Sequence, residues 1–142
     1  MSAARTLRHL LATPGAVRRA FPPAALAAIA QAIEESEHQI RFAVEAGLDV
    51  GPLLRGESAR ARAIEVFSEL RVWDTEHNNG VLVYLLLADR DVEIVADRGI
   101  SARVPVREWT RICAAMEARL AAGRYQHAVV EGIRDVARLL AG

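Results

Sequence analysis

Hydrophobic residues recur along the chain with two different periods, and each period predicts a type of element. Residues 39–45 alternate apolar and polar positions, the period-two pattern of a strand with one buried face. Residues 81–88 form a short, continuous apolar run, which predicts a central strand covered on both faces. After a turn at residues 89–91, alternation resumes over residues 92–96. These last two strands are therefore expected to form an antiparallel hairpin.

Apolar positions elsewhere follow helical spacing, with one apolar face along each segment. The predicted helices cover residues 5–12, 23–37, 57–70, 106–121 and a segment after Gly123. The first strand, the helix 57–70 and the central strand together predict a right-handed β-α-β crossover. The expected architecture is α/β: a small mixed sheet, made of that crossover plus the hairpin, flanked by helices, with two helices at the C-terminus.

The chain shows no internal repeat and no low-complexity tract. A Thr-Pro-Gly break at residues 13–15 separates the short first helix from the rest. The expected organisation is an N-terminal segment over residues 1–16 followed by a single domain over residues 17–142.

The amino-acid composition excludes several classes of function. The 142 residues are 52% hydrophobic and 25% charged, as in a globular domain, and 18 basic residues balance 18 acidic ones. This balance argues against nucleic acid as a partner. All basic residues are Arg, which excludes a Schiff-base or P-loop lysine. The single cysteine, Cys113, excludes an intrachain disulfide, and no Gly-rich loop points to an organic cofactor.

No segment is expected to span a membrane, because the longest apolar run, residues 81–88, is far shorter than the roughly 20 residues a spanning helix needs. Arg18-Arg19 ahead of an Ala-rich stretch superficially resembles a twin-Arg export signal. However, Pro22-Pro23 starts a helix well, and apolar residues follow at amphipathic spacing. A soluble, cytoplasmic protein is expected.

Polar chemistry is concentrated just before the central strand. Residues 73–80 read WDTEHNNG and supply two carboxylates, two amides, a hydroxyl and an imidazole. Hard oxygen donors of this kind suit Ca²⁺ or Mg²⁺ better than zinc. The residue order does not match an EF-hand. Alternatively, Asp, Asn and Gly simply form the turn that ends the preceding helix.

A second polar cluster surrounds the hairpin. Its members are Asp89, Arg90, Asp91, Glu93, Asp97 and Arg98. An apolar strand followed by Asp-x-Asp resembles the motif of aspartate-nucleophile phosphatases, but Glu93 stands where that motif has Thr or Val. The chain also continues as a strand instead of a helix. A charged hairpin turn is therefore the favoured interpretation.

Residues 67–100 (FSELRVWDTEHNNGVLVYLLLADRDVEIVADRGI) resemble the TPM domain. The shared features are a helix with a Phe, an acidic loop, Asn-Asn-Gly, an apolar strand, an Asp-Arg turn and a second strand ending before Gly. The flanks resemble the short, stand-alone bacterial branch, and the similarity covers most of residues 17–140.

The resemblance implies an α/β/α sandwich with a twisted mixed sheet. Relatives include a thylakoid acid phosphatase, a photosystem II repair factor and an animal receptor modulator, and some are associated with divalent cations. By matching position, the resemblance implies a cation site at Asp74, Glu76, Asn78 and Asn79, with His77 nearby. The secondary candidates are Asp89, Arg90, Asp91, Asp97 and Arg98.

Two functions follow as hypotheses. The first is a regulatory module that binds Ca²⁺ or Mg²⁺, or an unidentified protein partner. The alternative is a metal-dependent acid phosphatase, in which Asp74 and Glu76 hold the cation and Arg90 or Arg98 stabilises charge on a phosphorylated substrate. No compelling nucleophile or base stands beside the acidic segment, so the binding module is favoured.

Overall fold

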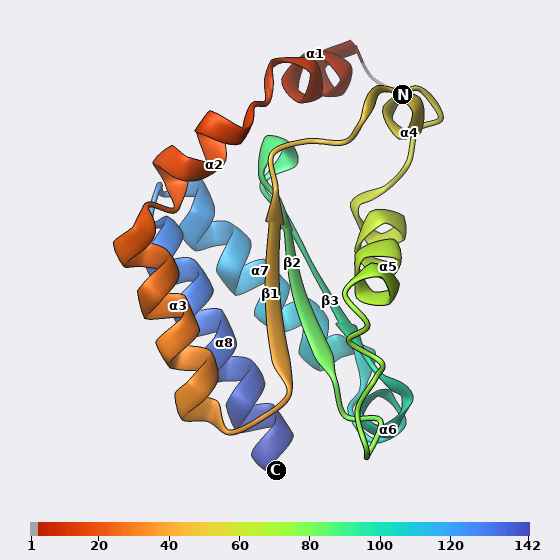
Figure 1. The fold of residues 1–142 in the computed structure, drawn as a ribbon, viewed down its shortest axis with the longest axis vertical. Coiled ribbons are helices and arrows are strands. Elements are labelled where there is room, and N and C mark those ends of the chain that lie inside the picture. The colour runs from red at the N-terminus through yellow and green to blue at the C-terminus, as the bar shows by residue number, and fades with distance from the viewer. Residues whose placement is uncertain (1–2) are drawn as a thin grey trace.

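The computed structural model describes residues 3–142, and its centre is a three-stranded sheet (Figure 1). Strand β1 (Ile40–Glu45) pairs in parallel with β2 (Val81–Leu86), and β2 pairs antiparallel with β3 (Asp91–Ala96), in the order β1-β2-β3. The parallel pair and the hairpin predicted from the apolar pattern are both present.

Helices cover both faces of the sheet, as Figure 1 shows. Helices α3 (Pro23–Ser36), α7 (Val106–Ala121) and α8 (Tyr125–Ala141) lie on one face, and α5 (Ala59–Glu69) lies on the other. The short elements are α1 (Ala3–Leu11), α2 (Pro14–Ala20), α4 (Val50–Leu54), α6 (Arg98–Ser101) and the 3₁₀ turn η1 (Leu87–Asp89). The expected α/β/α sandwich is confirmed.

Strand β2 is buried on both faces because its side chains enter two separate hydrophobic cores. Alternate residues Val81, Val83 and Leu85 contact the core under α3, α7 and α8. Leu82, Tyr84 and Leu86 contact the smaller core under α5. Successive side chains point to opposite faces of a strand, so a fully apolar run is what a central strand in a sandwich needs.

The structure contains short helices that the sequence pattern did not predict. Helix α2 begins at Pro14, with Thr13 capping the Ala16 N–H, so the predicted Thr-Pro-Gly break is a helix start. Helix α4 lies between the predicted strand 39–45 and the predicted helix 57–70, and α6 begins just after the predicted strand 92–96. All three have at most seven residues, too few to show a periodic apolar face.

One predicted strand end was wrong. The central strand ends at Leu86, not at residue 88, because the chain turns through η1 and Arg90 adopts a left-handed conformation with φ of 49°. Helix α2 includes residue 16, and the division between an N-terminal segment over residues 1–16 and a domain over residues 17–142 stays a prediction. The first two residues of that segment lie outside the described part. Between residues 3 and 142, no helix combines the length and the apolar character needed to cross a membrane.

Candidate functional site

The acidic segment forms a loop at the amino end of β2, next to the start of α6. The Asn78 carbonyl accepts a hydrogen bond from the Gly99 N–H at 2.9 Å, and the Gly80 carbonyl accepts one from the Asp97 N–H at 2.9 Å. Inside the loop, the Asn79 N–H donates to the Thr75 hydroxyl at 3.1 Å. The loop is thus held by backbone contacts to the far end of the hairpin.

Two glycines permit this close approach. A Cβ at Gly99 would lie 2.5 Å from the Asn78 carbonyl oxygen, and a Cβ at Gly80 would lie 2.1 Å from the Val72 carbonyl oxygen. Real Cβ atoms do not come this close to backbone oxygens, so any larger residue would push the loop away from the sheet.

The loop's carboxylates point into solvent and face basic neighbours instead of each other. Asp74 lies 3.2 Å from the Arg71 guanidinium, and Glu76 lies 3.9 Å from the His77 imidazole. The side chain of Glu76 is 89% exposed. Within residues 3–142, no three His, Cys, Asp or Glu side chains are placed to hold one metal ion. Asp74 and Glu76 are thus each placed beside a basic side chain.

Asp97 is the carboxylate that meets the loop backbone. Its Oδ1 accepts the Arg98 N–H at 2.8 Å, which caps α6, and its own N–H binds the Gly80 carbonyl. Its second oxygen, Oδ2, is buried and has no hydrogen-bond partner among the described residues. A buried carboxylate oxygen without a donor is costly, which makes this atom a candidate ligand for a cation or an ordered water. Arg98 itself is exposed beside it.

The remaining candidates lie at the opposite end of β2. The strand has six residues, so at about 3.3 Å per residue roughly 20 Å separates Asn79 from Asp89. Asp89 contacts Arg5 at 3.0 Å, Arg8 at 3.0 Å and the His9 Nε2 atom at 2.9 Å. The structure thus brings Asp97 and Arg98 to the acidic loop, while Asp89, Arg90 and Asp91 lie elsewhere.

These contacts explain the protonation state of Asp89. Burial raises the pKa of its carboxyl, but the hydrogen bonds from Arg5, His9 and Arg8 outweigh burial, so its pKa lies below the usual value. Asp89 therefore fastens α1 to the hairpin as a charged group.

Sequence reasoning missed a polar network at the carboxyl end of β1. Arg62 on α5 binds both oxygens of Glu45 at 2.8 Å, and the Tyr84 hydroxyl donates to Glu45 at 2.7 Å. Burial raises the pKa of Glu45, but these bonds outweigh it and the pKa is lowered. This network cannot be predicted from a local sequence motif, because its members lie 17 to 39 residues apart in the sequence.

The sandwich, its crossover-plus-hairpin sheet and the Asn-Asn-Gly loop before a buried strand define a TPM-type domain. The family model for the TPM domain matches residues 21–139, and the chain belongs to that family. A solved relative is the BA42 protein from the psychrophilic bacterium Bizionia argentinensis, determined by NMR. It is 28% identical, with a TM-score of 0.66 over 82% of this chain and 79% of that chain. No curated protein matches.

Proposed function

We propose that this TPM domain is a regulatory module that binds a divalent cation at the Asp97 end of the acidic loop and presents the ordered loop to a protein partner. The observation that carries the proposal is the buried Asp97 Oδ2 atom, which has no hydrogen-bond partner in residues 3–142.

The neighbouring chemistry suits Ca²⁺ or Mg²⁺. Asp97 lies against the backbone of Asn78–Gly80, a segment rich in carbonyl and amide oxygens. Ca²⁺ takes six to eight oxygen ligands from carboxylates, amides, backbone carbonyls and water, so a carboxylate with one buried oxygen and a polar loop suit it better than they suit zinc. A bound cation would neutralise Asp97 and order the loop around it.

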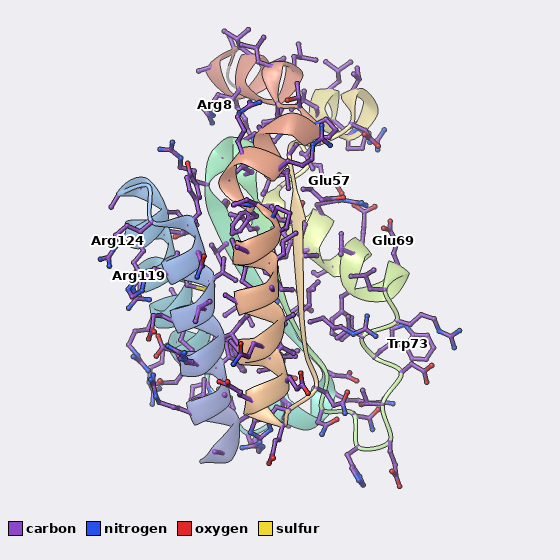
Figure 2. The ribbon with its side chains drawn as sticks, turned by 60° about the vertical axis from the view of Figure 1, so that its left-hand side comes forward. Arg8, Glu57, Glu69, Trp73, Arg119 and Arg124 are labelled. Carbon is purple, nitrogen blue, oxygen red and sulfur yellow. The ribbon has the colours of Figure 1, made fainter. Side chains whose placement is uncertain are left out.

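The outer side of the loop has the character of a protein contact. Trp73 is 46% exposed and points away from the body of the domain (Figure 2). The Arg71 guanidinium lies 5.4 Å from its ring centroid. Trp and Arg are the residues most often found at the energetic centres of protein interfaces. A loop anchored by backbone hydrogen bonds presents such a pair at low entropic cost.

A phosphatase requires more than this loop contains. Of the two arginines assigned to the phosphoryl group, Arg90 lies at the other end of β2, and Arg98 lies beside the loop. The exposed His77 is the nearest imidazole, and it faces Glu76 across 3.9 Å. We therefore favour binding over hydrolysis.

A cation titration followed by ¹⁵N–¹H NMR tests the proposal. Ca²⁺ or Mg²⁺ should shift the amides of residues 78–80 and 97–99, and chelator should reverse the shifts. Asp97→Asn should weaken binding at least about tenfold, since it removes the charged ligand. Asp74→Asn, the matched control that also removes one carboxylate, should change it by less than about threefold.

Two results would overturn the proposal. If neither cation moves these amides, or if Asp74→Asn abolishes binding while Asp97→Asn leaves it intact, the site is not at Asp97. Turnover of a phosphomonoester by the wild-type chain, lost in Asp97→Asn and in Asp74→Asn, would establish the phosphatase instead.

A further inference from the structure

A cavity of about 820 Å³ opens at the carboxyl ends of the two parallel strands, at the end of the sheet remote from the acidic loop. The residues after β1 and β2 form one side of it, and the α1–α2 segment forms the other. Open α/β sheets commonly bind ligands outside the carboxyl ends of their strands. The volume lies within the range of small-molecule sites.

The walls of this cavity are mostly apolar and made of small side chains. Ala16 and Ala20 line it from α2, Ala46 from the end of β1, and Leu87 from η1. Alanine at these positions leaves room that larger side chains would fill. Leu11 adds an aliphatic surface at the rim, where its side chain is 70% exposed.

Positive charge is concentrated at the same place, although the whole chain has a formal net charge of zero. Arg8, Arg19 and Arg90 line the cavity against the single carboxylate Asp89, so the lining charge is three minus one, or plus two. Asp89 is already paired with the basic residues of α1.

Arg19 and Arg90 have no such partner in the part of the chain that the structure describes. Among residues 3–142, neither guanidinium lies within ion-pair distance of a carboxylate, and Arg90 makes only a long 3.4 Å contact with the Tyr125 hydroxyl. The net positive charge of the cavity therefore resides on two guanidiniums whose donors are available to a ligand.

Tyr125 and the start of α8 add to this electrostatic preference. The Tyr125 ring packs against the buried Phe21 with ring centroids 6.0 Å apart, which holds its hydroxyl at the cavity wall. Helix α8 begins at Tyr125 with no side-chain cap and no acidic residue in its first turn. The unneutralised helix N-terminus contributes further positive potential.

We infer that this cavity binds a small organic anion that joins a carboxylate or phosphate head to an apolar body. The head contacts Arg19 and Arg90, and the apolar body lies along the alanine-lined wall. Bidentate guanidinium contacts recognise both head groups. This inference is independent of the cation site, which lies at the other end of β2.

Isothermal titration calorimetry with octanoate, octyl phosphate, neutral octanol and octylammonium tests the inference. We expect both anions to bind, and octanol and octylammonium to bind at least about tenfold more weakly. The relative affinities of octanoate and octyl phosphate show which head group the cavity prefers. NMR shifts on binding should fall on Ala46, Ala88, Arg90 and Tyr125.

Variants locate the site. Arg19→Gln and Arg90→Gln should each weaken octanoate binding about tenfold. Ala16→Leu should weaken it by filling the apolar wall without changing the charge. The control is Arg107→Gln, an exposed arginine on the first turn of α7, which should leave affinity unchanged.

The inference fails if octanol binds as well as octanoate, because the guanidiniums then contribute nothing. It also fails if the variants, shown by circular dichroism to be folded, bind like the wild type. Shifts that map to residues outside the cavity would place the ligand elsewhere and equally overturn it.

Discussion

Glu93 holds its carboxylate in an unfavourable position on the edge strand β3. Its side chain is only 24% exposed, and the Arg60 guanidinium lies 3.8 Å away. Burial and the neighbouring charge of Asp91 raise the pKa of Glu93 to about 7, with a smaller contribution from Glu117. The Glu117 carboxylate accepts a hydrogen bond from the Val92 N–H of β3 at 2.9 Å.

This raised pKa makes stability depend on pH in a defined direction. The pKa of Glu93 is near 4.5 in the unfolded chain and about 7 in the folded one, so the folded state binds more protons between these values. Stability contributed by protonated Glu93 is therefore present below about pH 4.5 and is lost as the pH rises to 7.

Glu93→Gln should consequently raise the free energy of unfolding by about 1 kcal/mol or more at pH 8 and by much less at pH 5. Urea denaturation at the two pH values measures the difference. Glu76→Gln, at a side chain that is 89% exposed, serves as the control and should have little effect at either pH. Equal effects of Glu93→Gln at both pH values would contradict the assignment.

At the scale of elements, α1 is attached to the domain by its basic face. Arg5, Arg8 and the buried His9 all contact Asp89, and the His9 Nδ1 atom accepts the Leu48 N–H at 2.9 Å. The leucines of the same helix, Leu7, Leu10 and Leu11, are 57–70% exposed. These exposed leucines therefore contribute little apolar burial to the attachment of α1, and Asp89 is the acceptor that its three basic side chains share.

We expect Asp89→Asn to loosen α1 and to lower the free energy of unfolding by about 1–3 kcal/mol, because it leaves the buried His9 and the partly buried Arg5 without a charged acceptor. Hydrogen exchange of the Leu48 amide should accelerate, since its acceptor His9 moves with the helix. Asp135→Asn removes a surface pair with Arg138 on α8 and should cost less than about 1 kcal/mol. Unchanged exchange at Leu48 would show that α1 is held by other contacts.

At the scale of the whole molecule, the central strand β2 contributes side chains to both hydrophobic cores. Every residue of β2 is buried, whereas β1 and β3 each have partly exposed residues. The six residues of β2 are each 0% exposed, and alternate side chains enter opposite layers. We therefore expect both layers to unfold together when this strand unfolds.

Leu82→Ala and Val83→Ala test whether the two layers unfold together, because Leu82 belongs to the core under α5 and Val83 to the core under α3, α7 and α8. Leu82→Ala should cost about 2–5 kcal/mol and Val83→Ala somewhat less, each through a cavity next to a different layer. Urea denaturation should remain a single transition for both variants. Leu26→Ala, at a side chain that is 45% exposed on α3, is the control and should cost far less. Two separate transitions would show that the layers fold independently.

Much of the fold could be predicted from local patterns. The alternation over residues 39–45 and the apolar run over residues 81–88 identified β1 and β2, and helical spacing identified the long helices. The resemblance to the TPM domain, carried by residues 67–100, agrees with the family match over residues 21–139. Short helices such as α4 escaped detection because five residues show no periodicity.

The sequence by itself determined which segments are strands and long helices, because side-chain periodicity is a local property. It also marked the polar segments on either side of β2. Only the tertiary structure decided that Asp97 meets the acidic loop while Asp89 binds α1 roughly 20 Å away, since six extended residues separate the two ends. It alone placed Arg19, Arg90 and Tyr125 around one cavity, because long-range packing brings together residues that no sequence spacing connects.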